Sequence, residues 1–173
     1  TPKHIECFDN SNIQGHDPVA SMVCFKNGRP SKKNYRKYNI KSVTGPDDFA
    51  SMHEIIFRRY RRIQEENGPM PDLIVIDGGK GQLNAAIKAL NELNLYGLIP
   101  VIGIAKRLEE IYYPYDEIPL FIEKKSTSLK LLQQIRNEAH RFAITFHRDK
   151  RSKTSLKSQF DQIPGIGPKT RTA

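Results

Sequence analysis

The sequence predicts an α/β fold in which helices cover both faces of a mixed β-sheet. Residues 1–43 contain short strand-like segments separated by turn residues, as expected for antiparallel strands. From residue 47 onward, segments with helical apolar spacing alternate with continuous apolar runs, a pattern typical of βαβ units. The chain has 173 residues, of which 38% are hydrophobic and 27% charged, and this fits one medium-sized domain with a real core.

The N-terminal segment is expected to form three antiparallel strands. Residues 4–8 and 20–25 are mostly apolar, and residues 34–40 alternate between apolar and polar side chains. Asn27 and Gly28 are a strong signal for a tight hairpin, because both residues tolerate the positive φ that such turns require. These features predict an antiparallel meander.

A helix is predicted to begin after the Thr44-Gly45-Pro46-Asp47 segment and to end at residues 67–69. Its apolar side chains recur at helical spacing and are expected to form one buried stripe. The members of this stripe are Phe49, Met52, Ile56, Tyr60 and Ile63.

The rest of the chain is predicted to alternate strands with helices. Residues 73–76 and 101–105 are continuous apolar runs, typical of strands buried on both faces. Helical spacing marks residues 83–93 and 129–143, and residues 111–123 are expected to form a polar-tipped hairpin. The resulting order is typical of an RNase H-like fold with a five-stranded mixed sheet, in which the first and fourth strands lie side by side.

The charge distribution favours a polyanionic partner. Lys and Arg total 28 against 19 Asp and Glu, a formal net charge of +9, although a basic protein without such a partner is the alternative. Basic residues gather in residues 26–41 and 141–157, which indicates a surface that follows a phosphate backbone. The predicted DNA-contacting residues are Lys32, Lys33, Arg36, Lys80, Arg136, Arg148 and Arg151.

Cys7 and Cys24 lie in strand-like apolar runs and are interpreted as buried thiols in a reducing compartment. Two isolated thiols cannot form a zinc cage. No apolar stretch is long enough to span a membrane, and no signal-peptide pattern precedes Thr1, so a cytoplasmic protein is expected. Both ends are expected to be cut points within a longer chain, and this segment is expected to be monomeric.

Asp9 and Asp77 each follow a predicted strand and are candidates for holding a metal ion. In the predicted fold these two strand ends are neighbours, and carboxylate oxygens are the ligands that Mg²⁺ and Mn²⁺ prefer. Two adjacent carboxylates would repel each other unless a cation lay between them. The alternative is that each Asp caps the turn that follows it.

Three further features could contribute to the same site. His140 lies on the last predicted helix and could bind a metal through its imidazole, or be an ordinary half-buried histidine. Lys106 follows a predicted strand and could steady a phosphate, or be a solvated lysine. The glycines of residues 78–81 do not fit the nucleotide phosphate-loop pattern and would instead let the backbone approach a substrate phosphate.

Four motifs resemble the C-terminal half of bacterial UvrC, the nuclease of nucleotide excision repair. They are residues 5–15 (IECFDNSNIQG), 47–52 (DDFASM), 71–83 (PDLIVIDGGKGQL) and 136–141 (RNEAHR). The resemblance implies an RNase H-like endonuclease that makes the 5′ incision in damaged double-stranded DNA, using Mg²⁺ or Mn²⁺. It also implies that the longer protein acts on a UvrB–DNA complex.

The resemblance also assigns roles to individual residues. It implies an Asp-Asp-His site made of Asp9, Asp77 and His140, with Lys106 nearby and Asp48 as a functionally sensitive acid. Residues 159–173 resemble the truncated start of a helix-hairpin-helix DNA-binding module, so the nuclease domain is expected to span residues 1–158. Two other hypotheses remain open: a DNA-binding module without cutting activity, and a nuclease of the transposase or resolvase type.

Overall fold

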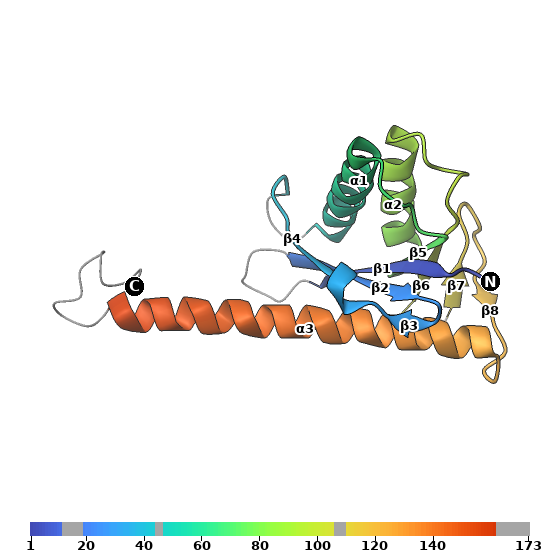
Figure 1. The fold of residues 1–173 in the computed structure, drawn as a ribbon. Helices are drawn as coiled ribbons and strands as arrows, with labels where there is room; N and C mark the ends of the chain where they lie inside the picture. Colours follow the sequence, from blue (N-terminus) through green and yellow to red (C-terminus); the bar gives the residue numbers. More distant parts are fainter. Residues whose placement is uncertain (12–18, 44–46, 106–109, 162–173) are drawn as a thin grey trace.

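The computed structural model describes residues 1–11, 19–43, 47–105 and 110–161. They form one sheet with three α-helices and a short 3₁₀ helix (Figure 1). The strands are β1 (His4–Ser11), β2 (Val19–Lys26), β3 (Arg29–Pro30), β4 (Arg36–Asn39), β5 (Leu73–Asp77), β6 (Val101–Ile104), β7 (Glu110–Tyr112) and β8 (Leu120–Phe121). The helices are η1 (Lys32–Asn34), α1 (Asp48–Glu66), α2 (Lys80–Glu92) and α3 (Thr127–Asp161).

The sheet is mixed, and its strand order places β1 beside β5. The order is β3-β2-β1-β5-β6-β7-β8, with β4 also paired to β2. β1 is antiparallel to β2 and parallel to β5, as the sequence predicted. The predicted count of five strands was wrong, because the sheet has eight. Of the three further strands, β7 and β8 form the hairpin that was predicted at residues 111–123, whereas the two-residue strand β3 at the other edge was not predicted.

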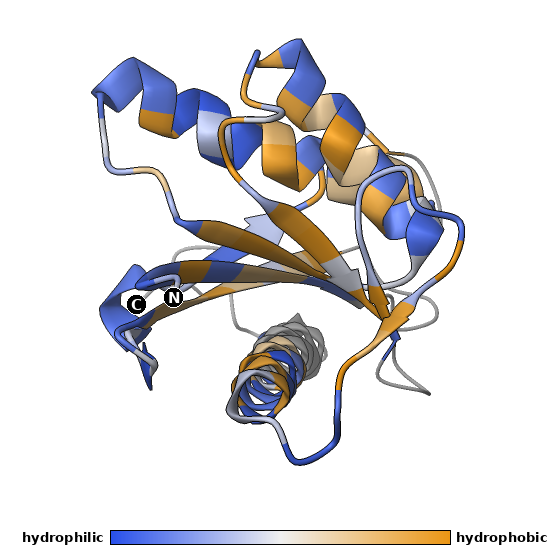
Figure 2. Ribbon diagram, turned by 90° about the vertical axis from the view of Figure 1, so that its right-hand side faces the viewer, coloured by the Kyte–Doolittle hydropathy of each residue, from blue (hydrophilic) through white to orange (hydrophobic). Residues whose placement is uncertain are grey.

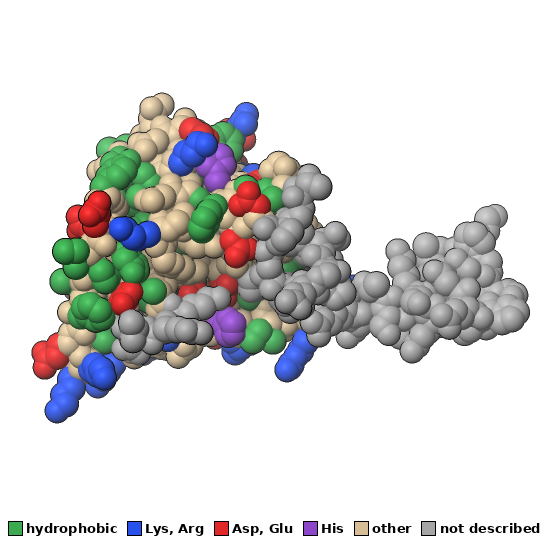
Figure 3. All heavy atoms as spheres, turned by 180° about the vertical axis from the view of Figure 1, so that it is seen from behind, with side chains coloured by type: hydrophobic (Ala, Val, Ile, Leu, Met, Phe, Trp, Pro, Cys, Tyr) green, Lys and Arg blue, Asp and Glu red, His purple; other side chains and the backbone are tan. Residues whose placement is uncertain are grey.

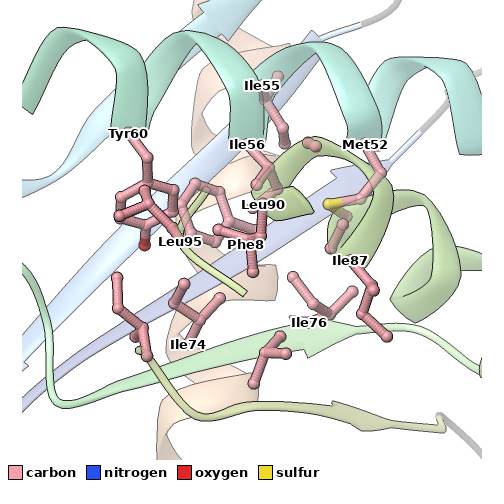
Figure 4. Packing of buried hydrophobic residues seen from close by; sticks show 14 of the residues in the cluster. Phe8, Met52, Ile55, Ile56, Tyr60, Ile74, Ile76, Ile87, Leu90 and Leu95 are labelled. Atoms are coloured by element: carbon pink, nitrogen blue, oxygen red, sulfur yellow. The ribbon is translucent and has the colours of Figure 1, made fainter. Parts of the chain in front are cut away.

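Helices α1 and α2 cover one face of the sheet (Figures 1 and 2). The core on this side is built from apolar side chains of both helices and of the central strands. Figure 4 shows Phe8 and Ile76 of the sheet packed beneath Met52, Ile56 and other side chains of the helices. At full burial each such side chain contributes about 1.5–3 kcal/mol, so this layer fixes α1 and α2 on the sheet.

Helix α3 packs on the opposite face. Its buried residues include Leu129, Ile135 and Ala139, which contact the other side of β1, β2 and β5. This apolar stripe was predicted, but the helix is longer than expected and ends at Asp161. Residues 162–173 are outside the described part of the chain, so the domain boundary and the helix-hairpin-helix segment stay predictions.

Alternation along β1 directs its side chains to the two faces in turn. Phe8 packs in the core beneath α1 and α2, whereas Ile5 and Cys7 pack in the core above α3. Asp9 continues the series of Ile5 and Cys7, because successive strand side chains point to opposite faces. The strand period therefore brings the Asp9 carboxylate to the face that α3 covers.

The predicted apolar stripe of α1 is correct except at its first member. Met52, Ile56, Tyr60 and Ile63 are buried, whereas Phe49 is 56% exposed. Asp47 caps the helix, its Oδ1 accepting a hydrogen bond from the Ala50 amide at 2.9 Å. Phe49 therefore lies in the first turn, at the end of the sheet where β1 and β5 finish.

Candidate metal centre

Asp9 and Asp77 lie at the carboxyl ends of two adjacent parallel strands. They are direct partners in the register between β1 and β5. Asp9 is fully buried and Asp77 is 6% exposed. Two apolar strands, which the core holds in parallel, thus bring together two carboxylates separated by 68 positions in the sequence.

His140 of α3 completes a cluster with these carboxylates. Its Nδ1 lies 3.5 Å from Oδ2 of Asp9. One possible ligand atom from each of Asp9, Asp77 and His140 lies within 4.8 Å of the other two. The structure therefore confirms that the three predicted residues meet in one place.

The composition of this cluster fits a divalent cation. Carboxylate oxygens and an imidazole nitrogen suit Mg²⁺, Mn²⁺ and similar ions, and an ion between two buried carboxylates would offset their mutual repulsion. Because the His140 side chain is 52% exposed and that of Asp9 only 1%, the cluster opens to solvent on the side of α3.

Arg136 and Cys7 lie close to the carboxylates. Burial raises the pKa of the Cys7 thiol well above its ordinary value; the charges of Asp77 and Asp9 raise it further, while Arg136 opposes them. Nη1 of Arg136 is buried and has no hydrogen-bond partner among the described residues. Arg136 thus places a positive charge near Cys7, and its predicted contact with DNA stays a prediction.

The position of His140 depends on contacts that the sequence analysis did not identify. The Tyr35 hydroxyl donates a hydrogen bond to Glu138 at 2.9 Å, and the Tyr35 ring meets Phe142 edge-on at 5.0 Å. Nζ of Lys37 lies 5.3 Å from the centre of the Phe142 ring. Glu138 is not a member of the cluster, and its bond to Tyr35 helps to hold α3 against the β3–β4 region.

The start of α1 is attached to the strand end beside Asp9. Nδ2 of Asn10 donates a hydrogen bond to the backbone oxygen of Asp48 at 2.7 Å. The Asp48 side chain is exposed and is not a member of the cluster formed by Asp9, Asp77 and His140. The functional role predicted for Asp48 therefore does not come from binding the metal as one of these three residues.

The other predicted contact residues are spread over the molecule. Lys32, Lys33 and Arg36 are exposed at the β3–β4 edge, and Lys80 is exposed at the start of α2. Arg148 is exposed on α3, but Lys106 and the side chain of Arg151 are outside the described part of the structure. Figure 3 shows the face behind that of Figure 1, where acidic and histidine side chains lie close together and much of the surrounding described surface is uncharged.

A basic pocket at the β4–α1 edge was not predicted. It encloses about 280 Å³. Arg36 donates hydrogen bonds to the backbone oxygens of Lys33 and Tyr35, so these contacts leave its charge unneutralised. The lining residues are Arg36, Lys37, Tyr38, Arg58, Arg59, Arg62 and Glu66.

Both cysteines are buried and free, as predicted. Among the described residues, no helix combines the length and apolar character that a membrane span requires.

Comparison with known proteins supports the interpretation of the site. The sequence model of the UvrC RNAse H endonuclease domain matches residues 1–144. UvrABC system protein C of Flavobacterium johnsoniae is 66% identical over 169 residues, which are 98% of this chain and 28% of the relative. The Porphyromonas gingivalis protein of the same name is 63% identical over 170 residues, again 98% of this chain and 28% of the relative.

The chain therefore spans about 28% of the length of these curated relatives. Among solved structures, endonuclease V of Bacillus subtilis aligns with a TM-score of 0.48 at 13% identity, covering 86% of this chain and 83% of that one.

Proposed function

This chain belongs to the UvrC RNase H endonuclease domain family, and from that premise we propose that it makes the 5′ incision in damaged double-stranded DNA during nucleotide excision repair. The observation that supports this proposal is the cluster of Asp9, Asp77 and His140 at the carboxyl ends of β1 and β5. A phosphodiester hydrolase needs a group that activates water and offsets phosphate charge, and this cluster can hold such a group.

Asp9, Asp77 and His140 would hold Mg²⁺ or Mn²⁺. When bound, the ion would lower the pKa of a water molecule and offset the charge of the phosphodiester. The two carboxylates are buried and fixed by the strand register, so they need little rearrangement to bind. His140 forms the exposed side of the cluster, so substrate approaches from the direction of α3.

Contacts to DNA are assigned to exposed basic side chains on several elements of the fold. Exposed Lys32, Lys33 and Arg36 line the β3–β4 edge, while Lys80 and Arg148 lie on α2 and α3. Lys and Arg contacts to phosphate are independent of base sequence, which suits a nuclease directed to lesions. In the longer protein the partner is the UvrB–DNA complex; this chain alone is proposed to be a cytoplasmic monomer.

The first experiment measures nicking of supercoiled plasmid DNA by the 173-residue chain in Mn²⁺ and in chelator. Asp77→Asn is expected to lower the rate by at least about 10²-fold, the scale on which loss of one transition-state-stabilising group acts. Asp116→Asn, which alters an exposed carboxylate outside the cluster, is the matched control. Full activity of Asp77→Asn would remove this carboxylate from the mechanism.

A binding readout separates the metal site from catalysis. Mn²⁺ at 100 times its Kd should stabilise the folded chain by about 2.7 kcal/mol, and this gain should disappear in Asp77→Asn. Metal and DNA binding without any nicking would favour the alternative of a binding module. A preference for nicked or gapped lesion duplexes over branched DNA would favour repair over a transposase-type or resolvase-type activity.

A further inference from the structure

Phe49 is an exposed aromatic ring on an otherwise buried stripe. It is 56% exposed, whereas the following stripe members of α1, from Met52 onward, are buried. Exposing a phenyl ring forfeits part of the roughly 1.5–3 kcal/mol that its burial would contribute. Because the partly exposed ring contributes less to the stability of the fold than a buried ring would, we looked for a functional role for Phe49.

Gly81 fixes where the Phe49 ring lies. A Cβ atom added at Gly81 would come within 2.4 Å of Cζ and 2.5 Å of Cε1 of Phe49. The ring therefore rests directly against the bare backbone in the first turn of α2. A side chain at position 81 would displace the ring, so one residue of α2 holds an exposed aromatic of α1 in a defined place.

This ring lies at the same end of the sheet as the metal centre. Asn10, the residue after Asp9, binds the Asp48 backbone oxygen at 2.7 Å, which anchors the first turn of α1. Gly81 follows Asp77 by four residues. Four residues span at most about 14 Å, which corresponds to about four nucleotide steps along one DNA strand.

Phe49 also forms one wall of a groove between α1 and α2. The groove measures about 540 Å³, and Phe49 is the one large exposed apolar side chain among its described lining residues. Exposed Asn84 offers hydrogen-bonding groups along it, whereas the Ser42 hydroxyl already donates to Glu54. The full lining is Ser42, Val43, Asp47, Phe49, Ala50, His53, Gly81, Asn84, Ala85 and Lys88.

A groove with a single large exposed ring suits a nucleobase better than a protein segment. Protein interfaces bury contiguous apolar patches around several anchors, whereas base stacking requires one accessible aromatic side chain. The other large exposed apolar residues lie outside this groove, mostly between Tyr96 and Phe121. Because Phe49 lies near the carboxylates of the metal centre, a base stacked on it would belong to DNA bound at that centre.

We propose that Phe49 stacks on a nucleobase within about four nucleotides of the scissile phosphate, and that the groove between α1 and α2 receives this base. The proposal rests on the proposed function, because it requires DNA bound at the Asp9–Asp77 site. Stacking on a phenyl ring tolerates any base, so Phe49 would position the strand without reading its sequence.

The test uses a nicked duplex in which 2-aminopurine, a fluorescent base that is quenched by stacking, replaces one base at successive positions near the incision site. The Asp77→Asn background keeps the DNA uncut. We expect a change in fluorescence at one or two adjacent positions. Phe49→Leu should abolish this change and weaken binding roughly 5- to 100-fold, whereas Phe49→Tyr should preserve both.

Two control variants separate stacking from general apolar effects. Leu98→Ala removes another exposed apolar side chain, at a site outside the groove, and should leave the fluorescence and the Kd unchanged. Gly81→Ala retains the ring but displaces it, and should reduce the fluorescence change without removing Phe49. Circular dichroism melting confirms that each variant is folded.

The outcomes distinguish this inference from the proposed function. If the parent chain binds DNA without nicking it, yet the fluorescence change depends on Phe49, the nuclease proposal fails and the stacking inference holds. The inference is overturned if the parent chain nicks DNA but Phe49→Leu, in the Asp77→Asn background, leaves the Kd and the fluorescence change unaltered. The same negative result would be expected of a ring that contacts a protein.

Discussion

Glu6 should make the stability of this domain depend strongly on pH. It is a fully buried acid in the central strand β1. Its carboxylate accepts hydrogen bonds from the Tyr60 hydroxyl at 2.7 Å and from Nη2 of Arg59 at 2.7 Å, and Nε2 of His4 lies 3.3 Å away. Substituting Glu6→Gln removes the charge while nearly preserving the shape, so it isolates the ionic contribution.

The size of the effect follows from the pKa of Glu6. Burial alone would raise this pKa, but the nearby His4 imidazole, the hydrogen bonds from Arg59 and Tyr60, and the Arg59 charge lower it from 4.5 to about 2. A pKa lower in the folded than in the unfolded state gives stability that is present above pH 4.5 and is lost as the pH falls toward 2. A difference of 4.5 − 2 = 2.5 pKa units corresponds to about 3 kcal/mol at neutral pH.

The assay is urea unfolding followed by circular dichroism at pH 7 and pH 3. The gap in unfolding free energy between the parent chain and Glu6→Gln should shrink from about 3 kcal/mol at pH 7 to about 1.4 kcal/mol at pH 3. Glu65→Gln is the control, since Glu65 pairs with Arg61 on the exposed face of α1 and should contribute less than about 1 kcal/mol. A gap that stays constant with pH would refute the assignment of this stability to the Glu6 charge.

Three further predictions concern α3, the sheet and the basic pocket. Tyr35→Phe removes the hydroxyl that binds Glu138 and should cost about 0.5–1.5 kcal/mol of unfolding free energy in urea titrations. Gly103→Ala places a Cβ about 3.0 Å from the backbone oxygen of Gly78 and should cost about 1–3 kcal/mol, measured as a lower melting temperature. Arg36→Ala should lower the slope of log K against log salt by about one unit in DNA-binding titrations, and an unchanged slope would exclude a phosphate contact.

The central strands and the metal centre were predictable because their signals are local. Continuous apolar runs marked β5 and β6. The acids that follow two of the apolar runs, Asp77 at the last position of β5 and Asp9 near the end of β1, indicated carboxylates at one sheet edge. The step from two strand ends to one site came from the fold pattern, since it needed β1 and β5 to be neighbours. Helical spacing placed His140 on a packed helix, but its membership of the site was implied only by the resemblance to UvrC.

The features that sequence missed depend on tertiary contacts. Glu6 is stabilised by Arg59, which lies 53 positions away, and no local pattern shows that pairing. Strand β3 has only two residues, too few to be recognised by propensity, and it forms because the edge of β2 offers hydrogen-bond partners. The exposure of Phe49 depends on Gly81 of another helix, so helical periodicity assigned the ring to the core.

The metal centre is divided between two structural layers, and this links ion binding to the docking of α3. Asp9 and Asp77 belong to the sheet, whereas His140 reaches them only if α3 is packed on β1 and β2. An ion held by all three residues binds more tightly when α3 is packed on the sheet than when α3 is detached. The ion therefore stabilises the packed state by the difference between these two binding free energies. By reciprocity, a substitution that loosens α3 far from the ligands, such as Tyr35→Phe, should weaken the affinity of the chain for Mn²⁺. We therefore expect Tyr35→Phe to raise the Kd for Mn²⁺ in isothermal titration calorimetry, and an unchanged Kd would separate metal binding from the docking of α3.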